Sequence, residues 1–331
     1  MSRILQFSRT GGPEVIELNE VDPPELKGEE VLYRVEAFAI NRGDLFWVAD
    51  TYYNSPTFPA RLGQEACGVV EAIGDAVTEF KVGDRVASLV QEDGGYCVDG
   101  EWAISPQRYL VPWHSRLTAE EGCAMWSQAL TSYYPFVELS SLDEGDTVLI
   151  TAASSTSGTG AVQMAKLCGA KVIGTSRGLD KREFLESLGV DEIVPTGYGS
   201  DLGQQLLELT DGTGVTAVFD TVLGDLPARY VDGLAADADV YLVGALSDDH
   251  TVSVPWLPMV RCAARFMGYS LYNYNRVDEM LARAKGFIGE AIADGRLRPV
   301  IDRVYPLEEV VDAYRYMLEG IQEGKIIIRC P

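Results

Sequence analysis

The stretch of sequence that decides the fold is residues 148–177, which read VLITAASSTSGTGAVQMAKLCGAKVIGTSR. Residues 148–150 form a short apolar run, and residues 152–158 are all small. Apolar side chains then recur at helical spacing up to Gly169, which is a typical helix end. Residues 171–175 have the composition of a second buried strand. This order of strand, tight turn, helix and strand predicts one βαβ unit.

The turn between the first strand and the helix differs from the usual G-x-G-x-x-G pattern. Ser155 and Thr156 stand where glycines are expected, whereas Gly158 and Gly160 are present. A turn of small residues lets backbone N–H groups approach a pyrophosphate at the start of a helix. The candidate contacts are Ser154, Ser155, Thr156, Ser157 and Gly158. On the motif alone, a strand-to-helix turn without a ligand stays an alternative.

The end of the second strand indicates which dinucleotide is bound. NAD-binding domains place a carboxylate about 20 residues after the turn, where it binds the ribose 2′-hydroxyl. Here the chain has Thr175, Ser176 and Arg177, and Lys181 follows shortly after them. Hydroxyl groups and two cations suit a 2′-phosphate, so we predict NADP(H) as the cofactor. The alternative for the two cations is a solvated loop and helix face.

The net charge of the chain restricts the classes of partner that it can bind. Its 331 residues are enough for two domains, and the net charge is −23, from 27 basic and 50 acidic residues. A negative field repels phosphodiester backbones and anionic lipids, which argues against nucleic acid and membrane partners. It also means that an anionic cofactor needs local cations.

The cysteines and the apolar runs indicate a cytoplasmic location. None of the six cysteines belongs to a C-x-x-C pair, so we expect free thiols rather than a disulfide framework. The first residues lack the long apolar core of a signal peptide, and no apolar run approaches 18 residues.

The first third of the chain has the pattern of β structure. Residues 30–38 alternate between apolar and polar side chains, and residues 62–74 and 80–86 form further strand-like runs with glycines near their ends. This region predicts a small closed β-barrel.

A series of short motifs in this order resembles a known superfamily. The motifs are Asn41-Arg42-x-Asp44, Gly63-x-Glu65-x-x-Gly68-Val69-Val70, Val82-Gly83-Asp84-Arg85-Val86, the nucleotide turn and Gly324-Lys325-Ile326-Ile327. Together they are similar to the medium-chain dehydrogenase/reductase superfamily, in its zinc-free, zeta-crystallin-like quinone oxidoreductase branch. The resemblance covers nearly the whole chain and implies an α/β fold with a GroES-like β-barrel domain and a Rossmann domain.

The second half of the chain fits that expectation. Six strand-like runs lie at residues 148–150, 171–175, 192–194, 217–220, 240–243 and 265–269. Alternation of strands and helices at this spacing predicts a doubly wound, six-stranded parallel sheet. Asp180 with Glu183 resembles a capping box at one helix start. We expect a GroES-like catalytic domain at residues 1–120, completed by 271–331, and an NADP-binding Rossmann domain at 121–270.

Two positions differ from the zinc-dependent members of the superfamily. Asn41 stands where those enzymes carry a cysteine ligand, and Gln64 stands where they carry a histidine. Two amides are a poor ligand set for catalytic zinc, so we expect no metal. Without a Lewis acid to bind an alkoxide, hydride transfer to an electron-poor acceptor is favoured over alcohol oxidation.

The resemblance also implies further site residues. Asn41 and Tyr52 are the catalytic candidates, Asn41 on the nicotinamide or the substrate carbonyl and Tyr52 as a proton donor. Packing within its loop is the alternative for Tyr52. Further cofactor contacts implied by the resemblance are Thr131, Thr196, Val222, Gly244, Ala245 and Leu246.

The substrate class implied is a small electron-poor acceptor, a quinone or the activated C=C bond of an enone or enal. Two alternatives stay open: an enoyl-thioester reductase acting on carrier-bound chains, and a protein that binds NADPH without turnover. Residues 240–243 and 265–269 are expected near a sheet edge, and by analogy with the family we expect a homodimer.

Overall fold

The computed structural model describes residues 2–331 except 93, 198–200, 245, 248 and 250. The chain forms two compact units, one from Met1–Ser127 with Asn275–Pro331 and the other from Gln128–Tyr274. The first unit is therefore discontinuous in sequence. Among the described residues, no helix is both long enough and apolar enough to cross a membrane.

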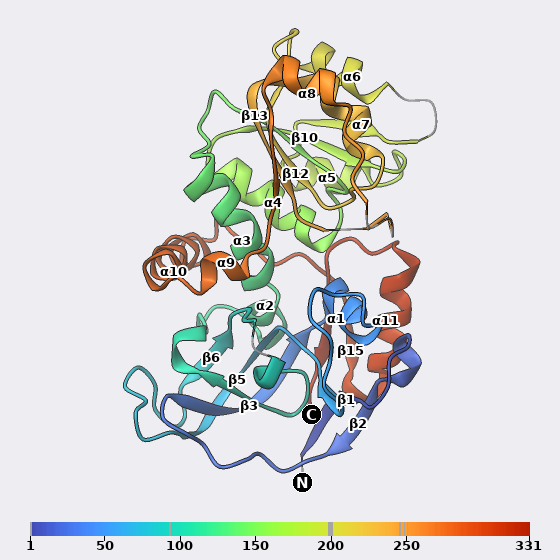
Figure 1. Ribbon diagram of the computed structural model, residues 1–331. Helices are drawn as coiled ribbons and strands as arrows, with labels where there is room; N and C mark the ends of the chain where they lie inside the picture. The colour runs from blue at the N-terminus through green and yellow to red at the C-terminus, as the bar shows by residue number, and fades with distance from the viewer. Residues whose placement is uncertain (1, 93, 198–200, 245, 248, 250) are drawn as a thin grey trace. The chain divides into compact units, whose positions relative to one another are not determined.

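The second unit is built on a six-stranded sheet (Figure 1). In spatial order its strands are β11 (Glu192–Pro195), β10 (Lys171–Ser176), β9 (Thr147–Ile150), β12 (Val215–Asp220), β13 (Leu234–Leu242) and β14 (Arg265–Gly268). Every pairing is parallel, as the alternation of strands and helices predicted. The order changes direction between β9 and β12, and all strands end at one edge of the sheet. Ligands bind at that kind of edge in doubly wound sheets.

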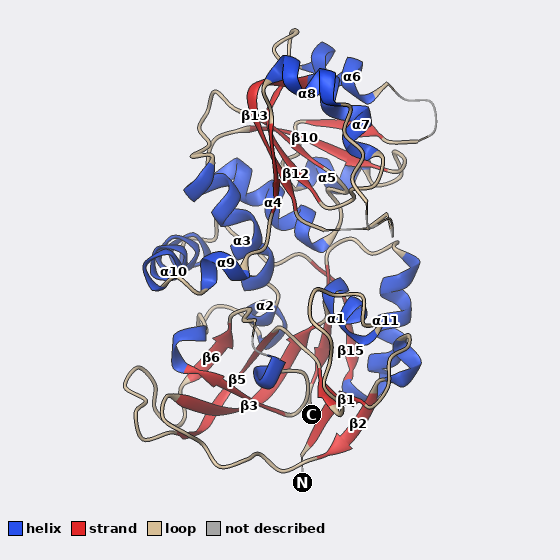
Figure 2. Ribbon diagram, in the orientation of Figure 1, coloured by secondary structure: helices blue, strands red, loops and turns tan. Residues whose placement is uncertain are grey.

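Helices alternate with these strands along the chain, and several of them flank the sheet (Figure 2). They are α3 (Trp126–Tyr133), the π-helix η4 (Tyr134–Leu139), α4 (Thr156–Leu167), α5 (Arg182–Ser187), α6 (Leu202–Leu209), α7 (Leu226–Tyr230), the 3-10 helix η5 (Val231–Gly233), α8 (Trp256–Cys262) and α9 (Tyr272–Asn275). The core contains Leu149, Ile173, Val218 and Val240, all at 0% exposure. Residues of this kind suit strands that are covered on both faces. The capping box predicted at Asp180 is wrong, because the N-cap of α5 is Lys181.

The first unit contains two sheets that share one core. The larger has the order β15 (Ile301–Pro306), β16 (Lys325–Arg329), β3 (Glu30–Ala39), β5 (Glu65–Ile73), β6 (Arg85–Ser88) and β8 (Leu110–Pro112), with β7 (Trp102–Pro106) also paired to β3. The smaller consists of β2 (Glu17–Glu20), β1 (Arg3–Phe7) and β4 (Ala60–Arg61). The GroES-like expectation is confirmed, and β15 and β16 from the end of the chain complete the sheet begun by β3.

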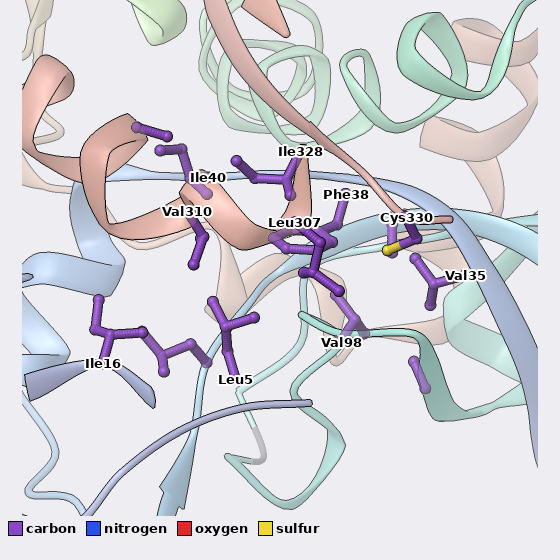
Figure 3. Packing of buried hydrophobic residues seen from close by; sticks show 14 of the residues in the cluster. Leu5, Ile16, Val35, Phe38, Ile40, Val98, Leu307, Val310, Ile328 and Cys330 are labelled. Atoms are coloured by element: carbon purple, nitrogen blue, oxygen red, sulfur yellow. The ribbon is translucent and has the colours of Figure 1, made fainter. Parts of the chain in front are cut away.

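The helices of the first unit are shorter, except for α10 and α11. They are η1 (Pro13–Val15), α1 (Arg42–Val48), η2 (Gly94–Tyr96), η3 (Gln107–Tyr109), α2 (Ala119–Cys123), α10 (Asp278–Ala293), η6 (Leu307–Glu309) and α11 (Val310–Glu319). Helix α11 buries Val310, Ala313, Tyr314 and Met317, an i, i+3, i+4, i+7 stripe. Figure 3 shows this core, where Leu307 and Val310 lie among Leu5, Val98 and Ile328.

Candidate active site

The turn after β9 has the shape that a phosphate-binding turn needs. Ser155 is the N-cap of α4, and its Oγ accepts a hydrogen bond from the Gly158 amide at 3.1 Å. Ala152 turns the chain with a φ of +45°. A Cβ on Gly158 would lie 2.5 Å from the carbonyl oxygen of Ala152, so only glycine lets the helix approach the strand this closely.

This turn fits the pyrophosphate of a dinucleotide. Its residues Ser154, Ser155, Thr156 and Ser157 are half-buried, and none has a long side chain. They therefore leave the N-terminus of the 12-residue helix α4 open to an anionic ligand. Thr175 supports the turn from behind, because its buried Oγ1 accepts a hydrogen bond from the Ala152 amide at 3.1 Å.

The predicted 2′-phosphate residues lie at the ends of β10 and β11. The Ser176 carbonyl accepts hydrogen bonds from the amide and the Oγ1 of Thr196, at 2.8 and 3.2 Å. These contacts place Thr196 beside Ser176. Arg177 is exposed in the loop after β10, and Lys181 is half-buried at the N-cap of α5.

The ends of β12 and β13 complete this edge of the sheet. The carbonyl oxygen of Thr221 accepts a hydrogen bond from the Leu246 amide at 3.0 Å, and a Cβ on Gly244 would lie 3.4 Å from the same oxygen. Val222 is half-buried, and its carbonyl bonds to the Ser247 amide at 3.1 Å. Ala245 lies outside the described residues.

Asp220, the last residue of β12, holds the turn after this strand in place. Its buried carboxylate accepts hydrogen bonds from Thr151 Oγ1, Tyr230 Oη and the amides of Val222 and Leu223, at 2.9–3.1 Å. Four donors fix this carboxylate and, with it, the turn that presents Val222.

Thr131 lies on α3 and is 8% exposed. One turn earlier on the same helix, Gln128 Oε1 accepts a hydrogen bond from Thr159 Oγ1 on α4 at 3.1 Å. A Cβ on Gly160 would lie 2.7 Å from Gln128 Cβ. Helix α3 therefore packs directly against the first turns of the helix that carries the phosphate-binding turn.

In the first unit, Asn41 belongs to a buried polar cluster. Lys325 and Glu65, at 0% and 1% side-chain exposure, form an ion pair. Lys325 Nζ also donates to Asn41 Oδ1 at 2.6 Å, and Asn41 Nδ2 donates to Glu65 Oε1 at 3.3 Å. The amide of Ser127 donates to Glu65 Oε2 at 3.0 Å. Each charge of the pair is thus compensated within the cluster.

A second group of buried acids adjoins Asn41. The backbone amide of Asn41 donates to Asp44 Oδ2 at 2.7 Å, and Tyr314 Oη lies 3.1 Å from Asp44 Oδ2 and 3.4 Å from Asp99 Oδ2. Burial raises the pKa of Asp44 to about 6. Burial and the charge of Asp44 raise the pKa of Asp99 well above its usual range. Burial and both carboxylates raise the pKa of Tyr314 in the same way.

Tyr52 lies on the loop after α1 and is half-buried. Its ring is 4.5 Å from the ring of Tyr53, centroid to centroid, at an interplanar angle of 45°. Tyr53 is 54% exposed. Tyr52 therefore packs against Tyr53, as the alternative for this residue requires. The role of Tyr52 as a proton donor stays a prediction.

Both units have counterparts among known proteins. A family model described as an alcohol dehydrogenase GroES-like domain matches residues 27–125, and one described as a zinc-binding dehydrogenase matches residues 158–286. A quinone oxidoreductase of Pseudomonas aeruginosa is 34% identical over 240 residues, 71% of each chain. The chain belongs to the quinone oxidoreductase branch of the medium-chain dehydrogenase/reductase superfamily.

Two further relatives of this oxidoreductase bear on its chemistry. The Escherichia coli quinone oxidoreductase, solved as a complex with NADPH, has a TM-score of 0.89 and 25% identity, and the match covers 99% of both chains. A phenolphthiocerol/phthiocerol polyketide synthase protein of Mycobacterium tuberculosis is 29% identical over 328 residues. That match covers 99% of this chain but only 15% of the synthase protein. Sequences of this kind thus occur both as separate reductases and within a long synthase chain.

Proposed function

We propose that this oxidoreductase uses NADPH to reduce a quinone or the activated C=C bond of an enone or enal, without catalytic zinc. The observation that carries the proposal is the turn after β9, where Gly158 lets the start of α4 approach the strand and small residues leave room for a pyrophosphate. Membership of the quinone oxidoreductase branch supports the reaction class.

NADP(H) is the cofactor, in agreement with the NADPH complex of the E. coli relative. We assign its 2′-phosphate to Ser176, Arg177 and Lys181, with Thr196 beside Ser176. Two cations at this strand end offset the repulsion that a chain of net charge −23 exerts on an anionic ligand. Val222, Gly244, Ala245 and Leu246 are assigned to the nucleoside part.

When bound, the cofactor supplies a hydride equivalent, and the protein supplies orientation and a proton. Asn41 and Thr131 are assigned to the nicotinamide end. Hydride addition to a quinone or an enone leaves an oxyanion that must be protonated. Tyr52 is the side chain that we assign to this proton transfer, since its hydroxyl is on a loop and only half-buried.

The residues that replace the zinc ligands support a metal-independent reaction. The side-chain amide of Asn41 is hydrogen-bonded to Lys325 and Glu65. The second position holds Gln64, whose side chain is also an amide. Neither side chain supplies the sulfur or imidazole nitrogen that zinc prefers.

A second candidate is reduction of an enoyl thioester carried by a protein. The observation in its favour is the match to the polyketide synthase protein over 99% of this chain. Both candidates require the same cofactor site, and they differ only in the acceptor.

We also propose a homodimer. Strand β14 is the edge of its sheet, and the preceding helix α8 exposes Trp256, Leu257 and Val260 at 65%, 64% and 58%. An unpaired edge next to exposed apolar side chains is typical of an interface. The cytoplasmic location expected from the sequence stays a prediction.

The test measures NADPH and NADH consumption in the presence of chelator, with a simple quinone, a conjugated enal and an enoyl thioester as acceptors. We expect NADPH-selective turnover of the quinone or the enal. The double variant R177A/K181A should lose the preference for NADPH, whereas R182A, on an exposed arginine paired with Glu186, should keep it. Turnover of the thioester alone selects the second candidate, and loss of activity to chelator contradicts the proposal.

A further inference from the structure

Arg229 of α7 contacts the backbone of the loop that follows β11. Its Nη2 donates hydrogen bonds to the carbonyl oxygens of Thr196 and Gly197, at 3.1 and 3.5 Å. These are the first two residues after β11, at the edge of the sheet where ligands bind. Because Nη2 carries two N–H groups, this one nitrogen can donate to both carbonyl groups. Arg229 therefore fixes the path that the chain takes as it leaves β11.

The loop that Arg229 contacts adjoins the proposed 2′-phosphate site. Thr196 donates hydrogen bonds from its amide and its Oγ1 to the Ser176 carbonyl, at 2.8 and 3.2 Å. A Cβ on Gly197 would lie 3.7 Å from the carbonyl oxygen of Arg177. Arg229 is thus connected to Ser176 through Thr196, and to the backbone of Arg177 through Gly197.

The contacts of Thr196 also indicate what this residue does at the site. A threonine has one backbone N–H and one hydroxyl proton to donate, and both donate to the Ser176 carbonyl. A phosphate group needs hydrogen-bond donors, which in the proposed site come from Arg177 and Lys181. Thr196 therefore serves the site by holding Ser176 in place, and Arg229 holds Thr196.

Helix α7 is itself anchored to the sheet. Leu226 and Pro227 are buried, and the buried Tyr230 donates from its Oη to Asp220 Oδ2 at 2.9 Å. Asp220 in turn fixes the turn after β12. The consecutive residues Arg229 and Tyr230 thus connect α7 to two neighbouring turns at the same edge of the sheet.

The other end of the loop after β11 also meets α7. Helix α6 follows this loop and lies beside α7 (Figure 1). A Cβ on Gly203 of α6 would lie 3.4 Å from the carbonyl oxygen of Arg229, so the two helices are in close contact there. The loop is therefore held to α7 at its start by the side chain of Arg229 and at its end by the packing of α6.

We infer that Arg229 is a positioning residue for the 2′-phosphate site, and that it contributes to selectivity for NADP(H) over NAD(H) by holding the loop after β11 against Ser176 and Arg177. The inference rests on the proposed function for the place of the 2′-phosphate. Arg229 acts through Thr196 and Gly197 and needs no contact with the phosphate group.

The test compares the dissociation constants of NADP⁺ and NAD⁺ for the full-length protein, measured by calorimetry. The R229M variant removes the donors of the side chain and keeps most of its apolar length. We expect R229M to weaken NADP⁺ binding about fivefold to tenfold, as the loss of one hydrogen bond does, and to leave NAD⁺ binding unchanged. The control R182M, which removes an arginine paired with Glu186 on α5, should change neither constant. Equal weakening of both dinucleotides by R229M would overturn the inference.

A second comparison separates positioning from direct contact. If Arg229 acts through the loop, R229M should cause no further loss of NADP⁺ affinity in the R177A/K181A background. A further loss of the same size would mean that Arg229 binds the phosphate group itself and would overturn the inference. Y230F, on the adjacent residue, loosens the turn after β12 and should weaken the two dinucleotides by equal factors. A change in selectivity as large as that of R229M would show that any disturbance of α7 has this effect, which also contradicts the specific role of Arg229.

The contact has a signature that needs no cofactor. In the wild-type protein without ligand, the Thr196 amide should exchange slowly with deuterium, because it is hydrogen-bonded to Ser176. R229M should accelerate this exchange and R182M should not. Fast exchange in the wild type, or unchanged exchange in R229M, would overturn the positioning role. If R177A/K181A kept the preference for NADP⁺, the proposed 2′-phosphate site would be refuted and the selectivity with it, whereas the exchange comparison would still test the contact.

Discussion

Asp99 offers a direct test of the buried acids near Asn41. Its carboxyl group is 0% exposed, and its Oδ1 has no hydrogen-bond partner among the described residues. Its Oδ2 competes with Asp44 for the hydroxyl of Tyr314, which can donate only one proton. One of the two carboxyl groups must therefore be protonated, so that it can itself donate a hydrogen bond within this cluster. The D99N variant keeps the shape of the side chain, and its amide can donate to Tyr314 without titrating.

The sign of the effect follows from the raised pKa of Asp99. In the unfolded chain Asp99 loses its proton near its usual pKa of about 4, so above this pH the folded protein binds one more proton than the unfolded chain. The free energy of unfolding of the wild type then falls by about 1.4 kcal/mol per pH unit. This contribution is fully present below about pH 4 and is lost as the pH rises toward the folded-state pKa.

The D99N variant lacks this pH-dependent loss of stability, because its side chain does not titrate. Between pH 5 and pH 7, the free energy of unfolding of D99N should rise relative to that of wild type, by at most about 1.4 kcal/mol for each pH unit. Urea unfolding followed by tryptophan fluorescence at pH 5, 6 and 7 measures the difference, and D22N, on an exposed aspartate, is the control. Parallel pH profiles for wild type and D99N would refute the reasoning.

Three other predictions concern the cofactor turn, the proton donor and the interface. G158A should abolish measurable NADP⁺ binding and lower the free energy of unfolding by about 1–3 kcal/mol, because the added Cβ would lie 2.5 Å from a backbone oxygen. The control is G286A on α10, which should leave NADP⁺ binding intact because its Cβ would enter open space. Y52F should lower kcat by about 100-fold at an unchanged NADPH dissociation constant, and Y53F should not; equal turnover of Y52F and wild type would remove Tyr52 from the mechanism. W256E should convert a dimer into a monomer in sedimentation experiments, and a dimer that survives this change would place the interface elsewhere.

Much of the second unit was predictable from sequence, because its signals are local. Each of the six apolar runs became a strand of the parallel sheet, and the small residues after β9 became the expected turn. Residues 117–139 comprise three separate helices, α2, α3 and the π-helix η4, which contains Pro135. Helical periodicity alone does not indicate such breaks, since the apolar spacing continues across them.

The cluster around Asn41 was not predicted, because it depends on pairing between distant parts of the chain. Strand β16 pairs with β3 in a register that sets Ile327 opposite Ala39. Two residues beyond this pair, Lys325 reaches Asn41, although the two are 284 positions apart in sequence. A lysine at the start of the apolar run Lys325-Ile326-Ile327-Ile328 was the available signal, since a buried cation requires an anionic partner.

The discontinuity of the first unit has a consequence for the order in which the chain is made and folds. The second unit is contiguous, so its sheet has all its strands once residue 274 has left the ribosome. The first unit has most of its strands by residue 127, but β16 and Lys325 are synthesised almost 200 residues later. Until then Glu65 lacks the cation that compensates it in the folded protein, and a carboxylate resists burial without one. Closure of the first unit therefore waits for Lys325, and the step that completes the fold is also the step that orients Asn41.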